Sequence, residues 1–170
     1  ENRRGHLLSV FFGRFEWGEI IFSENMAKPL AVCTNWKLMV TGAGGGARLA
    51  ECSVDVASPF EYMSFARGFP LRQPGHVRCA LYALVLGLEL VDGNRELLGA
   101  GRPIAVSTPN EWVARALESS VPGWVASGRW PPGAAKNRCL LERAYDLAEN
   151  LRRSDGVRVV LAKTDGPISE

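Results

Sequence analysis

The sequence predicts an α/β fold in which a mixed sheet is flanked by helices. Short apolar runs bounded by glycine, proline and polar residues are typical of strands, and longer Leu- and Ala-rich runs are typical of helices. Their order along the chain is strands, helix, strand, helix, helix, strand, which is the pattern of a sheet covered by helices. With 170 residues, the chain can build one domain with a sizeable core.

The first part of the chain carries most of the strand signals. Residues 6–12 and 14–22, around Gly13, predict a hairpin, and residues 30–34 ("LAVCT") predict a short apolar strand. Residues 48–57 and 60–69 predict a further pair of strands, which we expect to be antiparallel. The glycine-rich segment 41–47 lacks the lysine and the spacing of a phosphate-binding loop, so it predicts a flexible turn.

Helices alternate with strands in the rest of the chain. Residues 76–90 predict a buried helix, residues 92–97 a solvated turn, residues 102–107 a strand and residues 110–119 a second helix. The proline-containing stretches "VPGW" and "RWPPGAA" predict irregular structure. Residues 137–153 predict an amphipathic helix that ends before Gly156, with an apolar stripe of Leu140, Ala144, Leu147 and Leu151. Residues 157–162 predict the last strand.

Composition excludes several classes of site. The four cysteines lie far apart and only two histidines are present, so neither a zinc site nor a serine or cysteine hydrolase is expected. Free thiols favour a reducing compartment, and no segment resembles a membrane span or a signal peptide. We therefore expect an intracellular protein, nuclear or cytoplasmic, with no membrane partner. Because the chain opens with Glu1, we expect it to be part of a longer protein.

Several segments follow one another in an order that resembles the ribonuclease H family, especially its fungal type 1 branch. They are "IAVSTPNEWVARAL" (104–117), "WVASGRW" (124–130), "AAKNRCLLERAYDLAENL" (134–151) and "VRVVLAK" (157–163), preceded by "LAVCTN" (30–35) and "RCALYALVLGL" (78–88). The matching residues are Trp124, Gly128, Trp130, Lys136, Asn137 and Leu140. The resemblance spans roughly residues 30–163 and implies the ribonuclease H-like fold.

The same resemblance implies a degenerate active site. The family cleaves the RNA strand of RNA–DNA hybrids with two divalent cations, which are held by carboxylates because hard cations prefer oxygen ligands. Asn35, Ala80 and Pro109 stand at the acid positions of the first strand, the first helix and the next strand–helix junction. The last carboxylate has no clear counterpart. We therefore expect no catalytic residue, no metal and no cofactor, and only Glu51, Asp55, Glu111 and Asp165 could supply relocated ligands.

The junction at Pro109 has an explanation in helix stability. With Thr108 as N-cap, Pro109 is the first helical residue, where its missing N–H has no cost. Thr108 and Glu111 then form a Thr-x-x-Glu capping box.

The expected domain organisation is an N-terminal extension (1–29) that forms a hairpin, a ribonuclease H-like domain (30–166) and a tail (167–170). The hairpin either extends the sheet of this domain or, with the large apolar residues Phe12, Phe15, Trp17 and Phe22, binds a partner. The predicted function is a non-catalytic pseudo-ribonuclease H domain that serves as a protein-interaction module in a larger protein or complex.

Two alternatives stay open. The first is an inactive binder of RNA–DNA hybrid or structured RNA that uses Trp130, Arg129, Lys136 and Arg138, and the second is a metal-dependent nuclease with relocated carboxylates. Trp112 and Trp124 are expected to pack in the core and Trp130 to be partly exposed. The net charge of only +2 favours a protein partner over a nucleic acid, because basic residues dominate phosphate binding.

Overall fold

The structure is a computed structural model that describes residues 30–40, 48–57, 62–70, 75–98, 101–154 and 159–163. These residues form a five-stranded sheet in the order β3-β2-β1-β4-β5. The strands are β1 (Leu30–Val40), β2 (Arg48–Ala57), β3 (Tyr62–Pro70), β4 (Ile104–Thr108) and β5 (Val159–Lys163). β1, β2 and β3 are antiparallel neighbours, whereas β4 is parallel to β1 and β5 is parallel to β4. The predicted mixed sheet is confirmed.

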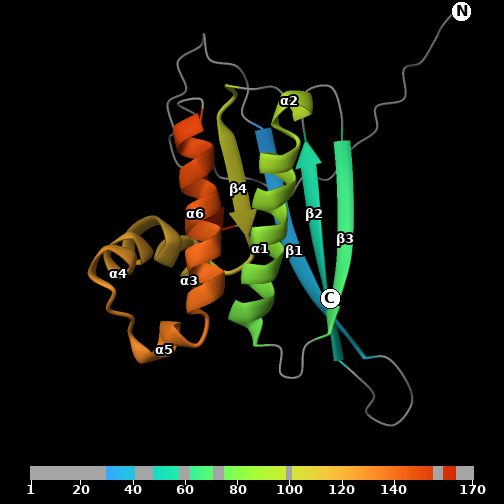
Figure 1. Cartoon of the computed structure of the whole chain (residues 1–170). Coiled ribbons are helices and arrows are strands. Elements are labelled where there is room, and N and C mark those ends of the chain that lie inside the picture. Colours follow the sequence, from blue (N-terminus) through green and yellow to red (C-terminus); the bar gives the residue numbers. More distant parts are fainter. Residues whose placement is uncertain are drawn as a thin grey trace, which may run out of the picture.

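The helices follow β3 and β4 in the sequence. They are α1 (His76–Gly93), α2 (Arg95–Leu98), α3 (Glu111–Arg115), a π-helical turn η1 (Ala116–Ser120), α4 (Val121–Ser127), α5 (Pro132–Ala135) and α6 (Arg138–Ser154). The two long helices α1 and α6 lie side by side over one face of the sheet (Figure 1). α1 contacts β1, β2 and β4, so it is the element that joins the sheet to the helical layer.

The core lies between the sheet and these two helices. α1 is rich in leucine and alanine, and its buried residues include Leu81, Leu84 and Leu88, which lie three and four positions apart on one face. The predicted stripe on α6 is confirmed for Ala144, Leu147 and Leu151, which are buried; Leu140 is only partly buried. The strands contribute Leu30, Val32, Ile104, Val106 and Leu161 to the same cluster.

The region that was predicted to be irregular is largely helical, although residues 128–131 between α4 and α5 have no regular secondary structure. Proline 122 lacks an N–H, so it cannot bind the carbonyl group four residues back. The chain continues through the π-helical turn η1, in which the Val121 N–H binds the Ala116 carbonyl oxygen five residues back. The helical run therefore extends to Ser127. Pro132 lies in the first turn of the short helix α5, where proline is tolerated.

Other element boundaries differ from the predictions. β1 extends to Val40, and the solvated turn predicted over residues 92–97 was wrong, because α1 extends to Gly93 and α2 follows. β4 begins at Ile104 and ends at Thr108. The antiparallel pairing of β2 with β3 is confirmed. The predicted hairpin at residues 6–22, the turn at residues 41–47 and the helix stop at Gly156 lie outside the described residues.

The capping box predicted for α3 was wrong. Thr108 is the last residue of β4, and its buried Oγ1 accepts a hydrogen bond from the Asn110 N–H at 3.4 Å. Asn110 is the N-cap: its backbone is extended, and its Oδ1 accepts from the Val113 N–H at 3.1 Å. Pro109 therefore precedes the cap, and Glu111 forms an exposed ion pair with Arg115 one turn later.

Replacement of the N-cap tests this assignment. Asn110→Ala should lower the free energy of unfolding by about 1 kcal/mol, because the Val113 N–H loses its acceptor. Glu111→Ala should lower it by less than about 0.5 kcal/mol, because an exposed i,i+4 ion pair contributes little. Urea denaturation of both variants measures the difference. A larger loss of stability in Glu111→Ala than in Asn110→Ala would support the Thr-x-x-Glu capping box instead.

Candidate functional site

The parallel pairing of β1 with β4 relates two of the three positions at which the resemblance predicts an acid. Cys33 of β1 lies opposite Ser107 of β4 in the last pair of their register. Pro109 follows the end of β4, whereas Asn35 lies inside β1, which continues to Val40 in pairing with β2. Both positions thus come two residues after the last β1–β4 pair, although they are 74 positions apart in the sequence.

Buried hydroxyl groups join β1 to β4 next to the last pair of their register. The Thr34 Oγ1 donates a hydrogen bond to the Ser107 carbonyl oxygen at 2.7 Å, and the Ser107 Oγ donates to the Val32 carbonyl oxygen at 3.4 Å. Thr34 and Ser107 are both buried, and a buried polar group is costly unless it is hydrogen-bonded. The chain's own side chains thus join β1 to β4 without a ligand between them.

The side chain of Asn35 is already engaged. Its Oδ1 accepts a hydrogen bond from the Trp36 N–H at 2.8 Å, and the residue is half-buried. Leu30, Val32 and Thr34 are buried and Trp36 packs against the core, so strand alternation places Asn35 on the opposite face from α1. A neutral amide oxygen in this position is a poor replacement for a carboxylate ligand.

An aromatic contact joins β1 to the start of α1. The rings of Trp36 and His76 have centroids 5.1 Å apart and are tilted by 57°. Ala80 lies one helical turn after His76, which places it on the same face of α1. It has no exposed surface and belongs to the apolar core. The third degenerate position is therefore enclosed by apolar side chains.

The acids named as alternative ligands do not assemble into a metal site in the described part of the chain. Glu111 is paired with Arg115, and Asp165 lies outside the described residues. Glu51 and Asp55 lie on β2, in register with Lys37 and Cys33 of β1, but their side chains are not described. Among the described residues, no group of three His, Cys, Asp or Glu side chains could hold a metal ion.

Cys79 is a buried cysteine near the start of α1. Burial raises the pKa of its thiol, although a backbone hydrogen bond lowers it in part. A raised pKa keeps this thiol protonated, and only the thiolate is a good nucleophile or metal ligand. Cys33 is partly buried and Cys139 is exposed, and both are free thiols.

A second candidate site lies where α4, α5 and α6 meet. The rings of Trp124 and Trp130 have centroids 5.4 Å apart, and the guanidinium carbon of Arg138 lies 5.5 Å from the centroid of the Trp130 ring. The indole N–H of Trp130 is buried and has no hydrogen-bond partner among the described residues. Arg138 also donates from Nε to Glu142 at 2.8 Å, so its charge is largely compensated.

The other predicted nucleic-acid-binding residues surround this aromatic pair. Arg129 and Lys136 are exposed, and within the described residues neither side chain forms an ion pair. The Lys136 carbonyl oxygen accepts a hydrogen bond from Arg78 at 3.3 Å, which links the start of α6 to the start of α1. The predicted partner-binding residues Phe12, Phe15, Trp17 and Phe22 lie outside the described residues.

The tryptophans differ from one another in burial. Trp124 packs against the core, as predicted, and Trp130 is partly buried. The prediction that Trp112 packs was wrong, because 42% of its surface is exposed. The reason is its place in the second helical position of α3, between the exposed residue Glu111 and the buried residue Val113.

The described architecture is shared with solved structures of ribonuclease H domains. The PFV RNase H domain has a TM-score of 0.53 and 14% sequence identity, with 81% of this chain and 79% of that chain covered. LC9-RNase H1, a type 1 RNase H with the type 2 active-site motif, has a TM-score of 0.54 and 15% identity, with 84% and 66% covered. The chain has a ribonuclease H-like fold.

This ribonuclease H-like fold also matches part of a larger protein. The foamy viral protease-reverse transcriptase in complex with RNA/DNA hybrid has a TM-score of 0.56 and 15% identity, with 82% of this chain covered. The chain spans only 17 to 19% of three such protease-reverse transcriptase chains. No protein-family model and no curated protein matches the sequence. At these identities the likeness establishes the fold.

The resemblance predicts acids at positions 35, 80 and 109, and their absence there remains a prediction about function. The resemblance also places glycine after Asn35, where this chain has Trp36. The contact of Trp36 with His76 could not be foreseen, because it joins residues 40 positions apart.

None of the described helices is both long enough and apolar enough to cross a membrane.

Restoring an acid at the enclosed position should destabilise the fold. Ala80→Glu places a carboxylate in the apolar core, which should lower the free energy of unfolding by about 3 kcal/mol or more at neutral pH. Burial raises the pKa of the introduced carboxyl, so the folded state binds more protons than the unfolded state and the loss shrinks as the pH falls. Chemical denaturation at neutral and acidic pH measures both effects.

Ala126→Glu is the matched control, because Ala126 is an exposed alanine on α4. It should change stability by less than about 0.5 kcal/mol. An Ala80→Glu variant as stable as this control would show that position 80 faces an open site.

Proposed function

We propose that the chain is a non-catalytic ribonuclease H-like domain that serves as a protein-interaction module in a larger protein or complex. The observation that carries this proposal is the occupancy of the three acid positions by Asn35, Ala80 and Pro109, with Ala80 enclosed in the core. The fungal type 1 branch, the division into residues 1–29, 30–166 and 167–170, and the nuclear or cytoplasmic location remain predictions from the sequence.

Elementary coordination chemistry supports the absence of two-metal catalysis. Paired divalent cations need carboxylates, both as oxygen ligands and to neutralise part of their charge. Asn35 supplies one neutral oxygen that already accepts from the Trp36 N–H. Ala80 and Pro109 supply none. Trp36, the residue after Asn35, contacts His76 at the start of α1 with its ring.

The charges of the described surface favour a protein partner over a polyanion. A phosphate backbone is bound by basic side chains that are free to replace its counterions. Five arginines of the described helices are instead paired with carboxylates: Arg115 with Glu111, Arg138 with Glu142, Arg143 with Glu89, Arg152 with Glu118 and Glu149, and Arg153 with Glu149. These pairs compensate the positive charge locally.

Trp112 is the described residue best suited to anchor a protein partner. It is the second residue of α3, three positions after Pro109, and it is 42% exposed. Tryptophan is enriched among the residues that dominate binding energy in protein interfaces. The apolar residues Phe12, Phe15, Trp17 and Phe22 of the N-terminal extension remain a second predicted contact.

The alternative proposal is an inactive binder of RNA–DNA hybrid or structured RNA. It is supported by the aromatic pair Trp124 and Trp130, by Arg138 over the Trp130 ring, and by the exposed Arg129 and Lys136. The foamy viral protease-reverse transcriptase of similar fold was solved with an RNA/DNA hybrid. The third proposal, a nuclease with relocated carboxylates, depends on Asp165, Glu51, Asp55 and Glu111.

A cleavage assay tests the absence of catalysis. The domain, incubated with labelled RNA–DNA hybrid and excess Mg²⁺ or Mn²⁺, should leave the RNA strand intact, because the acid positions supply no carboxylate. Gel electrophoresis of the RNA strand is the measurement. Cleavage that survives repurification and is lost in Asp165→Asn would replace this proposal with that of relocated ligands.

Variants of the exposed residues Trp112 and Arg129 distinguish the protein-binding proposal from the nucleic-acid-binding one. A partner that co-purifies with the intact parent protein should bind the Trp112→Ala variant at least about tenfold more weakly than the wild type. This is the effect expected from the loss of one residue that anchors an interface. Arg129→Ala should retain that protein. Hybrid binding should be weak and should collapse between roughly 50 and 200 mM salt.

The opposite pattern favours the alternative. Tight hybrid binding that persists at roughly 200 mM salt and is lost in Arg129→Ala but kept in Trp112→Ala would establish a nucleic-acid-binding domain.

A further inference from the structure

β5 is an edge strand of the described sheet. It pairs with β4 on one side, and it stands last in the order β3-β2-β1-β4-β5. The outward N–H and C=O groups of an edge strand are a template on which another strand can pair. Four of its five residues are uncharged and apolar ("VVLAK"), a composition that favours such pairing. The edge of β5 therefore needs protection.

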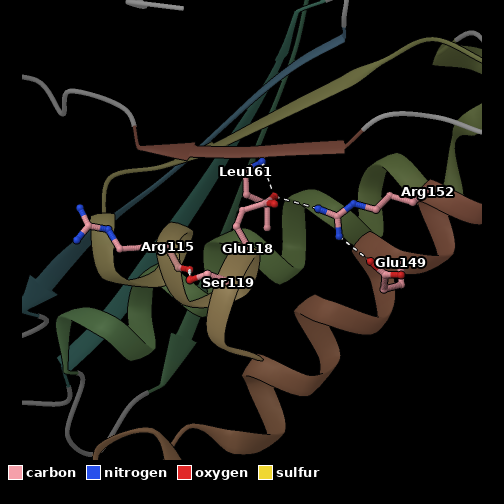
Figure 2. A network of polar contacts seen from close by, with 6 residues as sticks. All are labelled: Arg115, Glu118, Ser119, Glu149, Arg152 and Leu161. Carbon is pink, nitrogen blue, oxygen red and sulfur yellow. Dashed lines mark hydrogen bonds and ion pairs between the residues drawn. The ribbon is translucent and has the colours of Figure 1, made fainter. Parts of the chain in front are cut away.

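A side chain from the π-helical turn binds one of these outward groups. The Glu118 Oε1 accepts a hydrogen bond from the backbone N–H of Leu161 in β5 at 3.1 Å. Successive residues of a strand direct their N–H groups to opposite sides. Because Leu161 donates to Glu118 of η1 rather than to β4, its N–H faces away from the sheet. Figure 2 shows the Glu118 carboxylate between β5 and α6.

The carboxylate is held in this position from the other side. Arg152 of α6 donates from Nη2 to the same Glu118 oxygen at 2.9 Å and from Nη1 to Glu149 at 2.6 Å (Figure 2). The Arg152 side chain is only 27% exposed. A guanidinium shared by two carboxylates has a fixed orientation, so it directs the Glu118 oxygen toward β5.

The backbone that carries Glu118 is anchored as well. Leu117 and Val121, on either side of it in the helical run, are buried in the core. The π-helical turn that contains Glu118 exists because Pro122 cannot donate a hydrogen bond. Glu118 is thus an exposed acid on a rigid turn, in contact with the outer edge of the last described strand.

We propose that Glu118 prevents β5 from pairing with a strand of a second copy of this chain. An incoming strand requires the Leu161 N–H as a donor, and Glu118 already binds it with a charged acceptor. The carboxylate also places a negative charge where the backbone carbonyl oxygen of an incoming strand would lie. Removal of the side chain leaves the outward Leu161 N–H without this acceptor, and the domain associates by strand pairing at β5.

Two measurements on the full chain test the proposal. In Glu118→Ala, amide hydrogen exchange at Leu161, followed by NMR, should rise about tenfold, the change produced by loss of one charge-assisted hydrogen bond. Sedimentation velocity over a range of concentrations should show self-association of this variant and a monomer for the unmodified chain. Glu118→Gln keeps an acceptor oxygen, so it should stay monomeric with a smaller rise in exchange.

Glu111→Ala is the matched control. It removes an ion pair from the same helical run without touching β5, and it should leave Leu161 exchange and the monomeric state unchanged. The proposal is overturned if Glu118→Ala stays monomeric at every concentration, if its Leu161 exchange equals that of the unmodified chain, or if Glu111→Ala associates equally. Faster exchange without association would mean that Glu118 only holds β5 in the sheet, which also overturns it.

Discussion

β1 and β4 lie side by side in parallel at the centre of the sheet, and every other element takes its place from this pair. The Thr34 hydroxyl donates to the Ser107 carbonyl oxygen at 2.7 Å inside the core, where an unpaired hydroxyl would be costly. β2 and β3 extend the sheet on the β1 side and β5 extends it on the β4 side. The pairing also determines which residues meet at the end of the strands.

Apolar and aromatic side chains come together next to the last β1–β4 pair. Asn35 and Pro109 each lie two residues past this pair, and Trp36 contacts His76 at the start of α1. Ala80 on α1 belongs to the apolar core. In a cluster of metal-binding carboxylates, the mutual repulsion of the acids must be offset by cations. The described apolar side chains of this region instead pack in the core and contribute to the stability of the fold.

The helical segment between β4 and α6 shows that local sequence patterns do not by themselves predict where a helix begins or whether it continues through a proline. Thr108 and Asn110 are both good N-cap residues, and the choice of Asn110 follows from Thr108 being the last buried residue of β4. Proline is normally a helix breaker, yet the helical run continues through η1 to Pro122 in the first turn of α4, and the buried residues Leu117 and Val121 before it hold this run against the core. Tertiary packing therefore decides which of two suitable residues caps α3 and whether the helical run continues through Pro122.

The sequence by itself determined the fold class, the long helices α1 and α6 and the β2–β3 pairing. These features depend on periodicity and residue type, which are local properties of the chain. Only the tertiary structure decided that Trp112 is exposed, that Trp36 contacts His76 and that Glu118 reaches across 43 residues to the Leu161 N–H. Such contacts join residues far apart in the chain, and their partners are chosen by the packing of whole elements.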